Sequence, residues 1–409
     1  MKHDIKILMA ALFAVLLSGS LASCSDDDFD ATIFSTVDKP LDRTAYTFPL
    51  DTFVKVHFQE PYNMKYLYRM EDVGSDMDYN LVPCSYDKCT ILAVLCEYLW
   101  YDAYKEVVSE EFLKKYSPRI IHVIGSPAYN PSSGTEVLGT AEGGLKITLY
   151  NGNNLSPSDI EYMNEMFFKT MHHEFSHILN QNVNRPTDFD LISNGRYNVT
   201  SWQDTPDSVA LGQGFITPYG SSQAGEDWVE IIANYIVKDD NTWNRMLGAA
   251  EYDWEEVDYN VGDFDRAVAA GADRDTLGYM IKVGSYSGGQ PETYKVQRKR
   301  VVRDDTNTAV LNEEGKPTFT DDDGVNGRAV ILQKLGMTRD WLKENFGYDL
   351  DKMRAEVQKR QWVTDENGDF VRDASGNYIN KLTYRNADGT VLIDQLLGEI
   401  EKFKELQNK

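Results

Sequence analysis

The stretch that decides the fold is MHHEFSH, residues 171–177, which places the pattern HExxH at His173, Glu174 and His177. Side chains four positions apart share one face of an α-helix, so both imidazoles can reach a single ion. Zinc bound by two such imidazoles and one further protein ligand keeps a position for water, whose pKa falls to about 7. Glu174 projects beside them and is placed to take the proton of that water. The stretch therefore predicts half of a zinc site.

The other half cannot be a later histidine or cysteine. The chain has six histidines, none of which follows His177, and all four cysteines precede the motif. A third ligand from the C-terminal side must therefore be a carboxylate. A predicted helix from Glu226 onward offers Glu226 and Glu230 on one face, where two inward carboxylates are costly unless a positive group meets them. Zinc and its histidines would meet that need, whereas the alternative is a solvated helix face.

The motif lies in a segment that we expect to form one long helix over residues 159–181. Ser156, Pro157, Ser158 and Asp159 provide the capping residues, proline and acid of a helix start. His172 points away from the two motif histidines, so we expect it to pack in the core. The apolar stripe of this helix consists of Ile160, Met163, Phe167, Met171 and Ile178.

The remaining elements are predicted from periodicity and turn residues. We expect strands at 118–125, with His122 in the core, and at 142–150, and a strand-like region over 47–69. We expect helices over residues 91–108, 226–236, 240–280, 329–335, 338–343 and 394–407. A further helix should follow residues 347–351 and end at about residue 358. Residues 183–218 read as a long loop. Hairpins are predicted at 310–319 and at three glycine turns within 365–390, with glycine where positive φ is needed.

The N-terminus reads as a targeting segment. Lys2 and Lys6 flank the start, an apolar stretch covers residues 7–17, and Leu21-Ala22-Ser23-Cys24 resembles a bacterial lipobox. We expect removal of residues 1–23 as a signal peptide, acylation of Cys24 and a tether over residues 24–45. The alternative is an ordinary secretory signal. The other cysteines, Cys84, Cys89 and Cys96, read as buried apolar residues with at most one disulfide.

Composition narrows the class of protein. The chain has 409 residues, 42% of them hydrophobic, and a net charge of −24. This length allows a large buried core. The acidity argues against nucleic acid as a partner.

Two families resemble the chain at specific motifs. HExxH followed by Tyr219-Gly220 and then Glu226-x-x-x-Glu230 is similar to gluzincin metallopeptidases of the lethal-factor type. The resemblance implies that Glu226 is the third zinc ligand, that Glu230 orients a histidine ligand, and that Tyr219 donates to the oxyanion. It also implies that the strand before the zinc helix, 142–150, borders the cleft and accepts substrate by strand addition. An ordinary sheet strand is the alternative.

Over a wider span, three segments resemble the zinc metallohydrolase lipoproteins associated with substrate import. These segments are residues 61–63, 138–150 and 347–350. The resemblance implies an α+β, zincin-like domain with a small mixed sheet and a mostly helical lower part, over residues 46–280. Residues 281–409 would be a C-terminal extension with β-hairpins and helices packed on that domain.

The expected function is a zinc-dependent peptidase at the cell envelope, acting on a peptide or peptide-like substrate. The acidic run Ser25-Asp26-Asp27-Asp28 looks like a surface-export signal, so we expect an outer-membrane protein held by its lipid anchor alone and exposed at the cell surface. The alternative to exposure at the cell surface is exposure on the periplasmic side of the membrane. An outer-membrane import receptor is a candidate partner. The alternative function is a non-catalytic binding lipoprotein of an import system that uses the same cleft.

Overall fold

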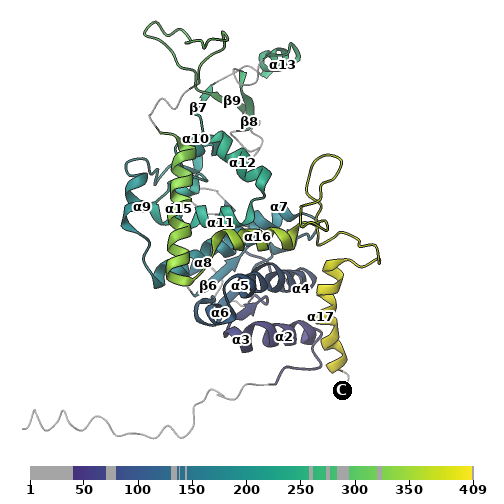
Figure 1. The fold of residues 1–409 in the computed structure, drawn as a ribbon. Helices are drawn as coiled ribbons and strands as arrows, with labels where there is room; N and C mark the ends of the chain where they lie inside the picture. Colours follow the sequence, from purple (N-terminus) through teal and green to yellow (C-terminus); the bar gives the residue numbers. More distant parts are fainter. Residues whose placement is uncertain are drawn as a thin grey trace, which may run out of the picture. The chain divides into compact units, whose positions relative to one another are not determined.

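The structure is a computed structural model, and it describes residues 40–70, 80–129, 136–137, 139–142, 145–257, 261–272, 277–282, 294–319 and 325–407. The chain divides into residues 1–42 and residues 43–409. The second unit is a mixed α/β structure with small sheets and mostly helices (Figure 1). The expected signal peptide, Cys24 and most of the expected tether lie outside the described residues. Among the described helices, none combines the length and the apolarity needed to cross a bilayer.

A four-stranded sheet stands beside the central helices. Its order is β1 (Lys65–Leu67), β2 (Ile120–Val123), β6 (Lys146–Leu149) and β5 (Gly139–Glu142). β1, β2 and β6 run parallel, and β5 runs antiparallel to β6. The strand predicted at 118–125 is confirmed as β2, and the one predicted at 142–150 is confirmed only over β6, since Glu142 ends β5 and residues 143–144 lie outside the described residues. The expectation that the second accepts a substrate by strand addition is wrong for β6, because β6 is paired on both sides and β5 forms one edge of the sheet.

The expectation of strands over residues 47–69 is mostly wrong. This region forms α2 (Phe48–Val54), the π-helical segment η1 (Lys55–Gln59) and α3 (Glu60–Tyr62) before β1 begins. Leu50, Phe53 and Phe58 are buried at roughly helical spacing, which the abundance of aromatic residues obscured. Pro49 also suits a first helical turn. The helix expected over 91–108 is present as α4 (Tyr86–Leu95), η2 (Cys96–Tyr101) and α5 (Asp102–Val107).

Two central helices carry the motif residues and pack directly against each other. The first is continuous through α7 (Ile160–Met163), η4 (Asn164–Phe168) and α8 (Lys169–Asn182). Asp159 caps it by accepting from the Tyr162 backbone N–H at 2.9 Å, as the capping pattern predicted. The second is α11 (Ala224–Val237), which confirms the helix expected from Glu226 onward. α8 also contacts β5 and β6, so the sheet lies beside the motif helix.

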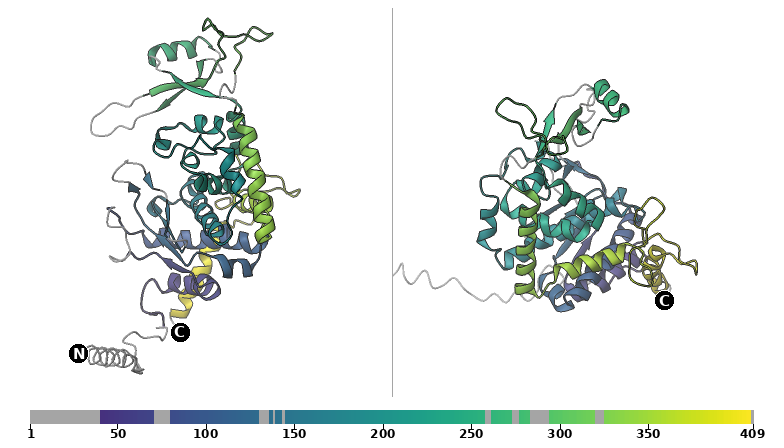
Figure 2. Two further views of the ribbon diagram at one scale, coloured as in Figure 1. Left: turned by 90° about the vertical axis from the view of Figure 1, so that its left-hand side faces the viewer. Right: turned by 45° about the horizontal axis from the view of Figure 1, so that its top comes forward.

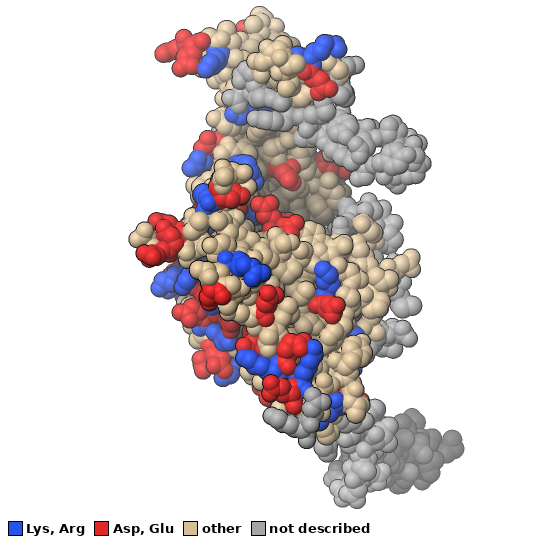
Figure 3. All heavy atoms as spheres, turned by 90° about the vertical axis from the view of Figure 1, so that its right-hand side faces the viewer, with Lys and Arg blue, Asp and Glu red and all other residues tan. Residues whose placement is uncertain are grey.

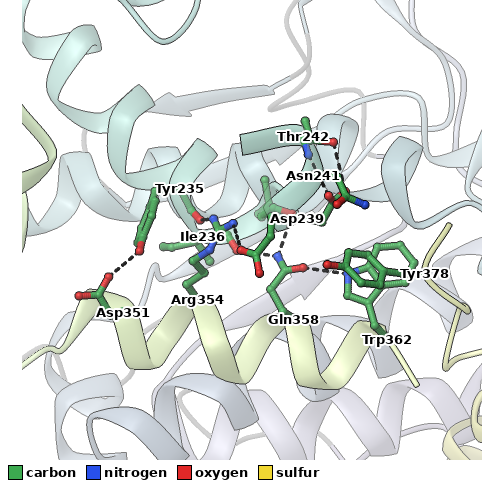
Figure 4. Close-up of polar contacts among 12 residues, drawn as sticks. Tyr235, Ile236, Asp239, Asn241, Thr242, Asp351, Arg354, Gln358, Trp362 and Tyr378 are labelled. Carbon is green, nitrogen blue, oxygen red and sulfur yellow. Dashed lines mark hydrogen bonds and ion pairs between the residues drawn. The ribbon is translucent and has the colours of Figure 1, made fainter. Parts of the chain in front are cut away.

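The helix α16 (Leu350–Gln361) holds the C-terminal end of α11 (Figure 4). Nε2 of Gln358 donates to the carbonyls of Ile236 and Val237 at 3.0 and 3.1 Å, and Arg354 donates to the carbonyl of Tyr235. The last carbonyls of a helix lack partners within the helix and are costly to bury unsatisfied. α16 therefore fixes where α11 ends.

The N-terminal end of α11 is held by a buried ion pair. Nζ of Lys334 lies 2.6 Å from the Asp227 carboxylate, and both side chains are fully buried. Lys334 comes from α15 (Gly327–Phe346), which packs against α11 and is one helix rather than the two expected at 329–335 and 338–343. Lys334 also donates to the carbonyl of Gly214 at 2.8 Å.

A second sheet follows α12 (Asp240–Ala249), with the order β7 (Trp254–Val257), β9 (Tyr294–Lys299), β8 (Tyr279–Lys282). Residues 240–280 are therefore not helical throughout as expected, although α13 (Val261–Ala269) lies among them. Trp243 and Leu247 are buried as predicted, whereas Ala269 is exposed. Trp254 Nε1 donates to the carbonyl of Ala249 at 2.9 Å, which ties β7 to the end of α12.

Polar hairpins occupy the C-terminal third. Antiparallel bridges join Leu311 to Pro317, Thr364 to Phe370, Arg372 to Tyr378 and Arg385 to Val391. The turn glycines at 315, 368, 376 and 389 all have positive φ, between 75° and 88°, as the turn patterns predicted. α17 (Leu392–Gln407) then packs on α2, which returns the chain to the start of this unit (Figures 1 and 2).

Shorter elements complete the fold. Residues 183–218, expected as a loop, contain α9 (Thr187–Ile192), η5 (Trp202–Asp204) and α10 (Asp207–Gly212). Acidic and basic side chains are interspersed over the face shown in Figure 3. The remaining elements are α6 (Glu110–Tyr116), β3 (Ala128–Tyr129), β4 (Glu136–Val137), η3 (Gly152–Asn154) and η6 (Tyr219–Ser221).

Candidate metal centre

α8 and α11 bring His173, His177 and Glu226 together. Oε2 of Glu226 lies 3.1 Å from Nε2 of His173 and 3.2 Å from Nε2 of His177. One ligand atom from each residue falls within 4.8 Å of the other two. Tetrahedral zinc with ligands about 2.0–2.2 Å away separates neighbouring ligand atoms by roughly 3.3 Å. The spacing around Glu226 and the donor set of two imidazoles and one carboxylate therefore fit zinc.

Glu230 fixes the ring of His173. Its Oε1 lies 2.7 Å from Nδ1 of His173, and its Oε2 accepts from Oγ1 of Thr217 at 2.7 Å and from Nδ2 of Asn234 at 3.1 Å. With Nδ1 engaged, the free ring nitrogen, Nε2, faces Glu226. Glu230 and Glu226 share one face of α11, as their spacing predicted.

The charges of the cluster are strongly coupled. Burial alone would lower the pKa of His173, but hydrogen bonds with Glu226 and Glu230 outweigh it and raise the pKa to about 10. Burial raises the pKa of Glu226, yet the hydrogen bonds from His173 and His177 hold it well below its usual value. The Glu226 carboxylate is therefore ionised at neutral pH, which suits a metal ligand.

Glu174 and Tyr219 lie beside this cluster. Glu174 is buried, and burial raises its pKa against the opposing effect of His173 and His177. The ring of Tyr219 stacks on that of His173, with centroids 5.9 Å apart, and also meets Trp202 at 4.9 Å. Burial and then the charge of Glu226 raise the pKa of Tyr219, so its hydroxyl stays protonated and able to donate.

His172 points away from the cluster, as predicted. Its Nδ1 lies 3.0 Å from the Tyr104 hydroxyl, and its ring packs near Trp100 in the aromatic core. Burial lowers its pKa to about 3, so it is neutral at physiological pH. His122 is likewise buried in β2, as expected. Cys84, Cys89 and Cys96 are all buried free thiols, in line with their expected role in the core.

A cavity of about 1010 Å³ opens at this cluster. His173, Glu174, Tyr219 and Glu230 line one part of it. Its walls continue along η4 and α8 on one side and along α11 on another, and α10, α12 and β9 complete it. Such a volume accommodates a ligand much larger than one amino-acid side chain. The candidate site therefore joins metal-binding and substrate-sized features.

Sequence reasoning missed several residues of this cavity. Glu165 and Lys169 stand eight and four positions before His173 on the same helical face, so their spacing could have identified them. Lys238 likewise stands eight positions after Glu230. Thr217 and Gln297 carry no comparable pattern, because they reach the site through the tertiary fold.

Comparison with known proteins agrees with this geometry. Residues 43–351 match the model of a family described as "Putative zinc-binding metallo-peptidase". A crystal structure titled as "a putative zinc-binding metallo-peptidase from Bacteroides caccae ATCC 43185" is 29% identical, with a TM-score of 0.53. The match covers 80% of this chain and 95% of that one. No curated protein sequence matches the chain. Since the family model spans well over half of its residues, the chain belongs to this family of zinc-binding metallopeptidases.

Proposed function

We propose that the chain is a zinc-dependent peptidase of gluzincin type, with His173, His177 and Glu226 as ligands. The observation that carries the proposal is the convergence of these three residues, from α8 and α11, at a cavity that Glu174 also lines. Zinc bound here would supply a water of lowered pKa and an electrophile for the substrate carbonyl. A purely structural zinc site would have no use for the buried Glu174 carboxylate.

The protein side chains divide the remaining work. Glu174 accepts the proton of the attacking water and passes it to the leaving amine, for which its raised pKa suits it. The Tyr219 hydroxyl donates to the oxygen that gains negative charge at the substrate carbonyl. Glu230 holds the ring of His173 in one orientation and tautomer. β5 offers a sheet edge next to α8 to which an extended peptide can add.

The test is a comparison of the purified chain with its Glu174→Gln variant. We expect about one zinc per chain in both proteins, as zinc ligation does not need Glu174. Digestion of a mixed peptide library should stop on chelation, resume with added zinc, and slow by roughly 10²–10⁴ in the variant. Zinc without cleavage of any peptide would support the alternative, a binding protein that uses the same cleft.

We further propose a location at the outer membrane with exposure at the cell surface, and association with an import receptor. The lipobox-like residues 21–24 and the acidic residues after Cys24 support this proposal. Cys24→Ala should abolish incorporation of labelled palmitate and release the protein from the membrane fraction. External protease should digest the parent on intact cells, and protection from it would place the protein on the periplasmic side.

A further inference from the structure

The cavity extends well beyond the catalytic residues. Glu230 and Asn234 of α11 and Lys238, the residue directly after this helix, line it at intervals of four residues, which is about 12 Å at the helical rise. An extended peptide covers this distance with roughly four residues. The far part of the cavity therefore lies where a substrate would run past the cleaved bond.

The wall formed by α12 and β9 carries a buried hydrogen-bond donor without an acceptor and an exposed cation. Gln297, on β9, is only 8% exposed, and its Nε2 donates to no other described residue. Arg245, on α12, is exposed, and its guanidinium donates to Oγ1 of Thr242 at 3.4 Å but forms no ion pair within the described part of the chain. A buried donor that stays unsatisfied is unfavourable, so a ligand that accepts from Gln297 is favoured.

The two lysines of the cavity share a single carboxylate. Nζ of Lys169 lies 2.5 Å from Oε1 of Glu165, and Nζ of Lys238 lies 2.6 Å from Oε2 of the same residue. Away from the metal cluster, Arg245 joins the two lysines as a third cation of the lining. Asp207 on α10 joins Glu165 as a second carboxylate. This excess of positive charge runs against the net charge of −24 of the whole chain.

The wall formed by α11 has the opposite character. Asn234 is 1% exposed, and its Nδ2 is engaged by the backbone and side chain of Glu230. Its Oδ1 accepts from no other described residue. Among the described residues, the cavity therefore offers one unmatched donor and one cation without an ion pair on one wall, and an unmatched acceptor on another. A peptide segment that carries a carboxylate, with an amide N–H close by, satisfies both.

We propose that this cavity binds a carboxylate of the substrate through Arg245 and Gln297, while Asn234 accepts an amide N–H of the same segment. The proposal rests on the peptidase function proposed above. The carboxylate comes either from an aspartate or glutamate side chain or from the C-terminus of the peptide. Arg245 supplies the charge, and Gln297 supplies a preset donor in a buried position. Asp207, on α10, disfavours a carboxylate placed against that helix.

The test measures peptide binding by the zinc-loaded full chain with Glu174→Gln, in which cleavage is slow enough for binding to be measured first. Three pools of random octapeptides are compared. The first contains no aspartate or glutamate and ends in an amide, the second adds one acidic residue, and the third restores only the free C-terminus. We expect the second or the third pool to bind roughly tenfold more tightly than the first, and the preferred pool identifies the source. Arg245→Gln and Gln297→Leu should each reduce this preference.

Arg385→Gln, which removes an arginine from an exposed hairpin turn, is the matched control and should keep the preference. Equal binding of the three pools, including no binding of any, overturns the proposal, as does a preference that survives both substitutions together. If the parent cleaves the first pool in a zinc-dependent reaction and as fast as the other two pools, only the carboxylate subsite is overturned. Carboxylate-dependent binding without cleavage of any pool overturns only the peptidase.

Discussion

Oε1 of Glu230 lies 2.7 Å from Nδ1 of His173, and this contact turns the other ring nitrogen toward Glu226. Thr217 donates to the second oxygen of Glu230 at 2.7 Å and accepts from the Gly220 backbone N–H at 3.1 Å. The turn that carries Tyr219 is thus connected to a histidine of the metal cluster through three successive hydrogen bonds. Metal binding and the position of Tyr219 are therefore structurally linked.

Glu230→Gln should lower the affinity for zinc by about 10–100-fold, because the amide is a weaker acceptor for the His173 ring N–H. Competition with a chromophoric zinc chelator measures this change. Glu161→Gln, on the exposed side of α7, is the matched control and should bind zinc as the parent does. Unchanged affinity in Glu230→Gln would show that the contact does not support the metal site.

Tyr219→Phe should lower kcat by about 10²–10³, since it removes one donor to the oxyanion. KM and zinc content should change little, because the ring that stacks on His173 remains. Steady-state kinetics on one peptide from the library gives both constants. Tyr129→Phe, at an exposed position, serves as control. An unchanged kcat would assign Tyr219 to packing alone.

Lys334→Met should destabilise the fold by about 3–5 kcal/mol, because it leaves the Asp227 carboxylate buried without its cation. Urea denaturation of the metal-free protein measures the loss. Lys316→Met, on an exposed hairpin, should have little effect. Adding Asp227→Leu to Lys334→Met should restore part of the stability. If neither Lys334→Met alone nor the double variant changes the free energy of unfolding, the pair does not hold α11.

Much of the site could be predicted because its determinants are local. The helix from Asp159 through His177 follows from a cap and an apolar stripe, and Glu226 and Glu230 follow from a four-residue interval on one face. Local periodicity misled over residues 47–62, where densely placed aromatic residues resemble strands. Lys334 and Gln358 could not be predicted, since each meets its partner on α11 more than 100 residues away in the sequence.

Glu165→Gln should destabilise the fold at neutral pH by about 1 kcal/mol, an amount reduced by solvent because the side chain is 41% exposed. Burial raises the pKa of Glu165, but the charges of Lys169 and Lys238 outweigh it, so the pKa lies below its usual value. The stability from its ionised form is therefore present above the ordinary glutamate pKa of about 4.3 and is lost as the pH falls through the lower, folded-state value. Urea denaturation of the metal-free proteins at several pH values measures the difference between parent and variant. That difference should shrink on acidification, and a difference that grew instead would contradict the assigned role of the two lysines.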